Sequence, residues 1–306
     1  MKRFDIVSIG EPMVEFNQTR PGEPSYLQGF GGDSSNLAIA AARTGARTAY
    51  VTRIGDDEFG RMFLRLWAEE GVDTGGVAVD PAAFTGAYFV FHGPQGHVFS
   101  YLRAGSAASR MSPRNLPLEL IRSARFVHAS GISMAISENA CDAVLAAFAE
   151  ARAAGAKISF DGNLRLKLWP LERARDRIGA AVAMADYFFP SLEDARALSG
   201  LESADANLDW AHRLGAGNVL LKLGPDGVVV SDGAARTRIP GHKVNAVDAT
   251  GAGDCFCGAA LARLAAGDAL LVAARYANAA AALATTGFGA VAPLPRPDAV
   301  RALLGR

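Results

Sequence analysis

The chain has 306 residues, 50% of them hydrophobic, and its 31 Lys and Arg residues balance its 31 Asp and Glu residues. This balance argues against a nucleic-acid surface or an acidic tail, and no apolar run approaches the length of a membrane span. Residues 1–10 predict an early strand rather than a signal peptide, so we expect a cytoplasmic protein. Cys141, Cys255 and Cys257 are too few for a disulfide framework, and the scattered histidines lack the spacing of a transition-metal site.

Short apolar runs alternate with Ala-, Leu- and Arg-rich stretches of helical period along most of the chain. This alternation predicts a mostly parallel sheet with helices on both faces, in one α/β domain over residues 1–306. Near-continuous apolar character at 219–221 and 228–230 fits strands that are buried on both sides. The expected strands are 6–9, 48–54, 126–129, 157–160, 187–189 and 219–223, and the expected helices are 37–43, 59–70, 140–154 and 171–184.

Two segments, about 12–34 and 84–104, interrupt this rhythm. Residues 12–30 are rich in Pro, Gly and Gln, and residues 85–101 hold two strand-like runs around a Gly93-Pro94-Gln95-Gly96 turn. We expect the two segments to pair into a small sheet that forms a lid over a cleft. The apolar hairpin is also typical of a dimer surface, so a homo-oligomer formed through the lid stays open.

A glycine-rich turn, Gly251-Ala252-Gly253-Asp254, precedes an Ala- and Leu-rich helical stretch. Glycines let backbone N–H groups approach a ligand, and the helix N-terminus adds positive charge, so the turn suits a phosphate. Asp254 fits there as a base that takes a proton from an attacking hydroxyl. An N-cap is its alternative role, and this segment alone does not decide between the two.

A second turn, Gly29-Phe30-Gly31-Gly32-Asp33-Ser34-Ser35-Asn36, also opens a helical stretch. Its small polar side chains suit the hydroxyls of a sugar. Asp33 or Ser34 could instead act as an N-cap in a flexible turn.

Together, Gly31-Gly32-Asp33-x-x-Asn36 and Asp248-x-x-Gly-Ala-Gly-Asp254 resemble the two signatures of the ribokinase-like (PfkB) carbohydrate kinase family. Further matches at 53–60 and 221–228 follow in order, so the resemblance spans nearly the whole chain. It implies a ribokinase-like three-layer α/β/α sandwich with a small β-sheet lid, and it implies ATP and Mg²⁺ as cofactors. It also implies Asp254 as the base and Gly251, Ala252 and Gly253 as the anion hole, and it leaves a monovalent-cation requirement open.

Within that family the chain looks most like 2-keto-3-deoxygluconate kinases, on residues 86–88, 101–107, 130–133 and 160–169. A 2-keto sugar acid carries a carboxylate, which a guanidinium fork holds well. Arg103 could instead be a solvated loop cation, the tyrosines could simply fill the small sheet, and Arg165 could reach an ATP phosphate. The candidate substrate-binding residues are Gly32, Asn36, Tyr88, Tyr101, Arg103, Arg165 and Asp254.

We expect ATP along the C-terminal edge of the main sheet, with adenine near 224–227 and 277–278. Lys222 has an alternative role as an edge residue with a buried stem. The family's Asn-x-x-Glu is replaced by Ser191-Leu192-Glu193-Asp194, so no metal ligand is assigned, and Glu193 or Asp194 could act through waters. The candidate nucleotide-binding residues are Asn163, Arg165, Ser191, Lys222, Gly224, Gly227, Gly251, Ala252, Gly253 and Asn278.

The sequence thus predicts ATP-dependent phosphorylation of the terminal hydroxyl of 2-keto-3-deoxygluconate, which gives the 6-phosphate. A kinase for a neutral sugar, fructose or ribose, is the first rival interpretation. A non-catalytic sugar or nucleotide sensor is the second, and the retained Asp254 argues against it.

Overall fold

The computed structural model describes residues 2–93 and 96–305, with residues 96 and 97 described by their backbone alone. The strands are β1 (Phe4–Ile9), β2 (Met13–Gln18), β3 (Tyr26–Gly31), β4 (Thr48–Gly55), β5 (Val72–Asp80), β6 (Ala87–Gly93), β7 (Gly96–Leu102), β8 (Ala124–Ser130), β9 (Lys157–Asp161), β10 (Tyr187–Phe188), β11 (Asn218–Lys222), β12 (Val228–Ser231) and β13 (Arg236–Ile239). The helices are α1 (Asp33–Arg43), α2 (Glu58–Glu69), α3 (Leu118–Arg122), α4 (Gly131–Ala135), α5 (Glu138–Ala153), α6 (Leu171–Ala183), α7 (Leu192–Ser199), α8 (Ala204–Leu214), α9 (Ala252–Ala265), α10 (Leu270–Ala284) and α11 (Pro297–Leu303). Short 3-10 turns lie at Ala108–Arg110, Pro113–Asn115 and Gly224–Asp226.

The main sheet has nine strands in the order β13-β12-β11-β10-β9-β8-β1-β4-β5. Every neighbouring pair from β11 to β5 is parallel, and only β11–β12 and β12–β13 are antiparallel. The mostly parallel sheet is therefore confirmed. The predicted strands and helices all form, with ends that differ by a few residues.

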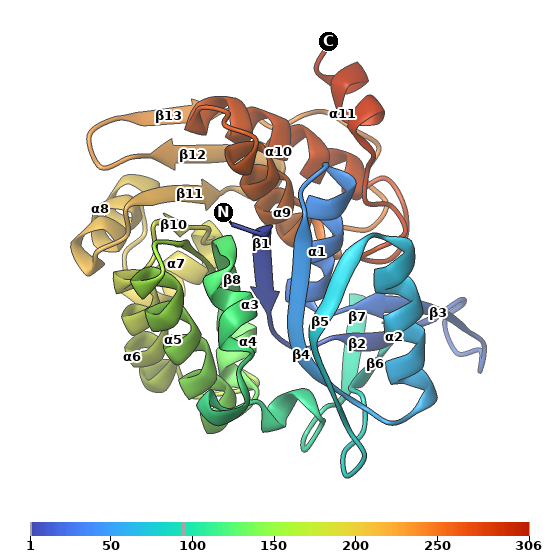
Figure 1. Ribbon diagram of the computed structural model, residues 1–306. Coiled ribbons are helices and arrows are strands. Elements are labelled where there is room, and N and C mark those ends of the chain that lie inside the picture. The colour runs from blue at the N-terminus through green and yellow to red at the C-terminus, as the bar shows by residue number, and fades with distance from the viewer. Residues whose placement is uncertain (1, 94–95, 306) are drawn as a thin grey trace.

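Helices cover both faces of this sheet (Figure 1). On β1, Ile6 joins the hydrophobic cluster that contains the buried residues of α1, α9 and α10. Val7 points to the opposite face and joins the cluster that contains the buried residues of α5, α6 and α8. The alternation of side chains along a central strand thus divides the core into two layers, which confirms the three-layer α/β/α arrangement.

The predicted lid is a separate four-stranded sheet in the order β3-β2-β6-β7. The hairpin pairs Tyr88 with Tyr101, while Pro94 and Gln95 of its predicted turn lie outside the described residues. Aromatic contacts join the lid to α2, with ring centroids 5.7 Å apart for Phe16–Phe59 and 5.2 Å apart for Phe30–Phe63. The pairing of segments 12–34 and 84–104 is therefore confirmed.

Two strands escaped prediction. The run of β5 is interrupted by Gly75 and Gly76 and carries a register irregularity against β4, so it lacks the continuous apolar pattern of its neighbours. Strand β13 alternates arginine with Thr237 and Ile239 at the edge of the sheet. Within the described residues, no helix is long and apolar enough to cross a membrane.

Candidate active site

The N-termini of α1 and α9 meet above the carboxyl ends of the parallel strands. The two helices pack closely because Gly258 has no side chain, since a Cβ there would lie 2.5 Å from the carbonyl oxygen of Leu37. This approach brings the Asn36 amide Nδ2 to 2.8 Å from Asp254 Oδ2. The two glycine-rich turns, more than 200 residues apart in sequence, therefore contribute to one site.

Asp254 is not an N-cap. The N-cap of α9 is Gly251, whose φ of 76° lies in the left-handed region that glycine favours, and Asp254 lies inside the first helical turn. A Cβ on Gly251 would also lie 2.9 Å from the carbonyl oxygen of Ala290. The cap of α1 is likewise a glycine, Gly32 with φ 98°, rather than Asp33 or Ser34.

One N–H group of the predicted anion hole already has an acceptor inside the turn. The N–H of Ala252 donates to the carbonyl oxygen of Ala249 at 3.2 Å, so the turn itself uses this donor. Among the described residues, no acceptor binds the N–H groups of Gly251 and Gly253. These two N–H groups therefore stay available to an anion, and that of Ala252 is a weaker donor.

Partly buried carboxylates gather beside this turn. Burial raises the pKa of Asp254 well above its usual range, and the Asp33 carboxylate adds to that rise, whereas the Asn36 amide opposes it. Burial also raises the pKa of Asp33, although the hydroxyl of Ser130 lowers it. Asp254 is therefore a stronger base than a solvated aspartate.

Lys222 lies beside the predicted anion-hole turn. Its Nζ is 2.7 Å from Asp161 Oδ2 in a buried ion pair, and a Cβ on Gly253 would be 3.4 Å from the same Nζ. Burial lowers the pKa of Lys222, but the Asp161 carboxylate more than compensates, so the pKa is raised and the amine stays charged. Cys257 Sγ contacts Asp161 at 3.4 Å, while all three cysteines are free and buried.

Three of the other candidate nucleotide-binding residues form hydrogen bonds through their side chains. Asn163 has an unusual positive φ of 32° and donates from its amide to Asp33 at 2.8 Å. Ser191 is the N-cap of α7, and its hydroxyl accepts from the N–H of Asp194. Asn278 is 7% exposed and donates to the carbonyl oxygen of Pro240 at 2.8 Å.

Gly224 begins the 3-10 turn after β11, and Gly227 follows it directly. A Cβ on Gly227 would lie 2.1 Å from the carbonyl oxygen of Ile239, so Gly227 packs directly beside the Pro240 loop that Asn278 holds. The predicted adenine region is thus brought together around this loop.

The lid contributes the aromatic and basic candidates. Tyr88 is 5% exposed and donates from its hydroxyl to Glu15, whereas Tyr101 is 39% exposed, with ring centroids 5.9 Å apart. The Arg103 guanidinium stacks over the Tyr101 ring at 5.7 Å. A Cβ on Gly31 would lie 2.5 Å from the Tyr88 hydroxyl, so this glycine gives Tyr88 room beside the first turn.

Arg103 and Arg165 occupy different surroundings. Arg103 is paired with the buried Glu11. Arg165 is exposed, donates to the carbonyl oxygen of Leu164, and lies near the Asp194 carboxylate. No contact joins the two arginines among the described residues, so Arg165 belongs to the Ser191–Asp194 side of the site.

Sequence reasoning missed two carboxylates, Glu11 and Glu15, which are 1% and 3% exposed. Burial raises the pKa of Glu15, and the hydrogen bond from the Tyr88 hydroxyl opposes this rise. A Cβ on Gly289 would lie 3.5 Å from Glu15 Oε1. The available signal was an acidic residue inside the otherwise apolar run Met13-Val14-Glu15-Phe16, because a strand that buries both faces rarely carries an unpaired charge.

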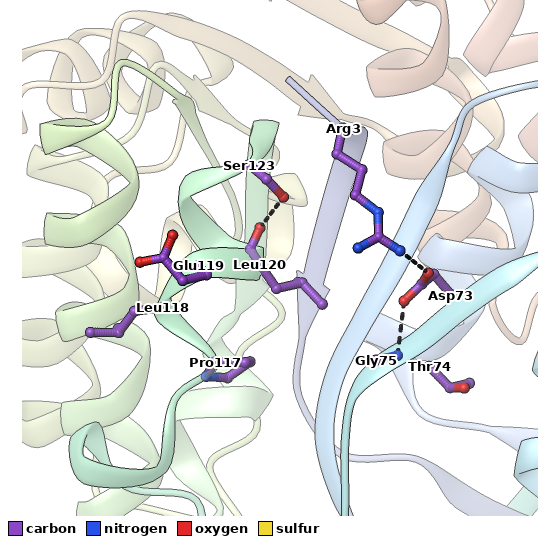
Figure 2. A pocket seen from close by; sticks show the side chains of 9 residues that line it. All are labelled: Arg3, Asp73, Thr74, Gly75, Pro117, Leu118, Glu119, Leu120 and Ser123. Atoms are coloured by element: carbon purple, nitrogen blue, oxygen red, sulfur yellow. Dashed lines mark hydrogen bonds and ion pairs between the residues drawn. The ribbon is translucent and has the colours of Figure 1, made fainter. Parts of the chain in front are cut away.

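A cavity of about 580 Å³ lies at the opposite edge of the main sheet (Figure 2). Arg3 at its rim is already paired with Asp73 at 3.0 Å. None of the candidate site residues lines it, so it is separate from the site above. The lining residues are Arg3, Asp73, Thr74, Gly75, Pro117, Leu118, Glu119, Leu120 and Ser123.

Comparison with known proteins matches residues 3–297 to the family described as pfkB family carbohydrate kinase. Fructokinase-1 of Oryza sativa subsp. japonica is 36% identical over 307 residues, which cover 95% of this chain and 94% of the relative. A 2-dehydro-3-deoxygluconokinase of Thermoproteus tenax is 36% identical over 264 residues, which cover 83% of this chain and 80% of the relative.

Among solved structures, a putative ribokinase II from E. coli in complex with ATP and Mg²⁺ is similar with a TM-score of 0.92 at 27% identity, over 99% of both chains. This similarity confirms the ribokinase-like fold. The family match over 3–297 and the two paired glycine turns agree, and the chain belongs to the pfkB family of carbohydrate kinases.

Proposed function

We propose that this carbohydrate kinase phosphorylates the terminal hydroxyl of a sugar acid, 2-keto-3-deoxygluconate, with ATP. The observation that carries the proposal is Arg103, whose side chain is 10% exposed at the lid side of the site. Its Nε is buried and has no hydrogen-bond partner. A buried donor on a cation is costly to leave unpaired, and a ligand carboxylate is the strongest acceptor for it.

In the proposed reaction, Asp254 takes the proton of the terminal hydroxyl. The hydroxyl oxygen then forms a bond to the γ-phosphorus of ATP, and the bond between that phosphorus and the bridging oxygen of ADP breaks. The Asn36 amide, 2.8 Å from Asp254 Oδ2, holds the carboxylate in one orientation. The N–H groups of Gly251 and Gly253, with Lys222, stabilise the negative charge on the transferring group.

The residues near Lys222 fit magnesium-bound ATP. Asp161 Oδ1 is buried without a hydrogen-bond partner, and Asp194 carries a second carboxylate whose pKa is raised by burial and by Asp161. Carboxylate oxygens suit Mg²⁺, which keeps several waters in such sites. Bound magnesium would supply positive charge to the phosphates, and Asp161 and Asp194 would hold it through water.

A neutral sugar is the alternative substrate, and Glu11 and Glu15 favour it. Both carboxylates are buried beside Arg103 and Tyr88, where they could accept hydrogen bonds from sugar hydroxyls and would repel a ligand carboxylate. The relatives named above include a fructokinase and a 2-dehydro-3-deoxygluconokinase at the same 36% identity, so identity does not discriminate.

A coupled assay of ADP formation tests the proposal with 2-keto-3-deoxygluconate, its galactonate epimer, fructose and ribose. We expect kcat/KM for one of the two sugar acids to exceed that for fructose by about 100-fold or more, because a site built for a polar group discriminates strongly. Higher kcat/KM with fructose or ribose would replace the substrate assignment. If none of the four sugars leads to ATP consumption, the result would favour a non-catalytic sensor.

Arg103→Ala separates the two substrate classes within one protein. It should raise KM for a sugar acid by about 100-fold, the cost of a lost charge-assisted hydrogen bond of roughly 3 kcal/mol, and it should affect a neutral sugar much less. Arg3→Ala, in the cavity at the opposite edge, is the matched control and should leave both KM values unchanged. Equal effects of Arg103→Ala on both substrates would contradict the assignment of Arg103 to a carboxylate.

A further inference from the structure

Glu11 follows strand β1 and takes no part in the proposed proton transfer or phosphoryl transfer. Its carboxylate is 1% exposed and forms an ion pair with Arg103, whose side chain is 10% exposed. The hydroxyl of Ser106, which is fully buried, donates to the other carboxylate oxygen. Both oxygens of this carboxylate are therefore held by residues that follow lid strand β7.

Glu11 also lies where the chain passes between the body and the lid. Glu11 itself connects β1 to β2, and Arg103 leaves β7. Gly32 connects β3 to α1, and a Cβ there would lie 2.3 Å from the carbonyl oxygen of Glu11. Gly86 enters β6, and its Cβ would lie 3.1 Å from Glu11 Oε1. Every connection between the lid strands and the body thus passes against this one residue.

The ion pair of Glu11 with Arg103 compensates the charge of a buried guanidinium beside the lid. A buried guanidinium without a counter-charge is strongly unfavourable, and removing one partner of a buried pair leaves the other charge uncompensated. The Glu11 carboxylate accepts a hydrogen bond from Arg103 Nη2, while Arg103 Nε is buried and has no hydrogen-bond partner. The guanidinium therefore keeps a donor for a ligand while its position is fixed in the free protein.

We propose that Glu11 is a positioning residue of the sugar site, which anchors Arg103 at the lid hinge so that the guanidinium and the lid strands are set for the sugar before it binds. This inference rests on the proposed role of Arg103 in sugar binding. Without Glu11, the unpaired guanidinium turns toward solvent and the sugar loses its contact, whereas the nucleotide side, built from α9 and β11, is unaffected.

The test is a double-mutant cycle of Glu11→Gln and Arg103→Ala, with KM for the sugar, KM for ATP and kcat measured for each variant. The sugar is whichever one the wild-type enzyme phosphorylates best, so failure of the substrate assignment is read separately from failure of this inference. We expect Glu11→Gln to raise the sugar KM by about tenfold, because small misplacements of a positioned group are costly. KM for ATP should change by less than about twofold, and the double variant should resemble Arg103→Ala alone. Glu11→Asp, which keeps the charge, should recover part of the loss.

Glu70→Gln is the matched control, because Glu70 forms another buried pair with Arg43, both side chains 10% exposed, away from the sugar site. It should lower the melting temperature as Glu11→Gln does, yet leave the sugar KM unchanged. Hydrogen exchange without ligand adds a second readout, since Glu11→Gln should speed exchange in β6 and β7 and Glu70→Gln should not. A folded Glu11→Gln protein with wild-type sugar KM and wild-type exchange in the lid would overturn the proposal, and so would additive effects of Glu11→Gln and Arg103→Ala on KM.

Discussion

Lysine–aspartate ion pairs at the two edges of the main sheet differ in their exposure to solvent. At the amino-terminal edge, Lys157 pairs with Asp186 at 2.9 Å, and the lysine is 60% exposed. At the carboxyl-terminal edge, Lys222 pairs with Asp161 at 2.7 Å, and the lysine is 16% exposed. The same residue types at nearly the same distance are solvated in one place and buried in the other, and only the buried pair has an oxygen left without a partner.

We interpret this contrast as a difference between surface charges, which are solvated, and charges that we propose take part in the reaction. Exposed pairs contribute little to stability, so they can be lost without consequence. Carboxylates such as Asp254 and Asp33, whose pKa values are raised by burial, cost stability, and proteins retain such groups where a reaction needs them.

The largest effect is expected from Asp254→Asn. Removing the base should lower kcat by about 1,000-fold or more, within the range of general-base catalysis. The asparagine Oδ1 can still accept from the Asn36 amide, so the dissociation constant of the sugar should change by less than about threefold. Steady-state kinetics measures kcat, and titration calorimetry measures the dissociation constant of the sugar. Near-normal turnover would show that Asp254 is not the base.

Lys222→Met should lower kcat by about 100-fold, since one donor to a developing anion is typically worth that much. Lys157→Met, the matched substitution in the exposed pair at the other edge, should leave kcat within about twofold of wild type. Because breaking a buried pair also destabilises the fold, the Lys222→Met/Asp161→Asn double variant should regain stability without regaining activity. Full activity in that double variant would place the Lys222–Asp161 pair outside the reaction.

Asp254→Asn should also stabilise the free protein at neutral and basic pH. A carboxyl group whose folded pKa lies above its ordinary value of 3.8 takes up a proton in the native state first, so its contribution to stability is lost as pH rises through the raised pKa. The variant lacks this loss, and its melting temperature at pH 8 should be about 2 °C higher. The difference should shrink toward pH 4, and a less stable variant at pH 8 would contradict the raised pKa.

The smallest effect is expected in the cavity of Figure 2. Arg3→Ala removes an arginine side chain that is 70% exposed and its pair with Asp73. We expect a loss of stability of about 0–1 kcal/mol by chemical denaturation and an unchanged kcat/KM for both substrates. A clear loss of activity would mean that the amino-terminal edge communicates with the site.

The sequence predicted the carboxyl-terminal edge best where the chemistry is local. Gly251, Gly253 and Asp254 are neighbours along the chain, so the turn and its acid could be identified together. The lid pairing was equally visible, because Tyr88 and Tyr101 belong to one hairpin.

What escaped prediction depends on contacts between distant segments. The ion pair of Glu11 with Arg103 and the contact of Glu15 with Tyr88 join residues 92 and 73 positions apart. The use of the Ala252 N–H by Ala249 also follows from the conformation of the turn and not from its composition. Strand β5 was missed because two glycines interrupt its apolar run.

The most direct test of the central claim is the product itself. Wild type and Asp254→Asn are incubated with ATP, Mg²⁺ and 2-keto-3-deoxygluconate, and the product is identified by ³¹P NMR. We predict a phosphomonoester on the terminal hydroxyl with one ADP formed per sugar phosphate for the wild type, and no such product from the variant in the same time. ADP without a sugar phosphate in the wild type, or the same product from Asp254→Asn at a similar rate, would contradict the account.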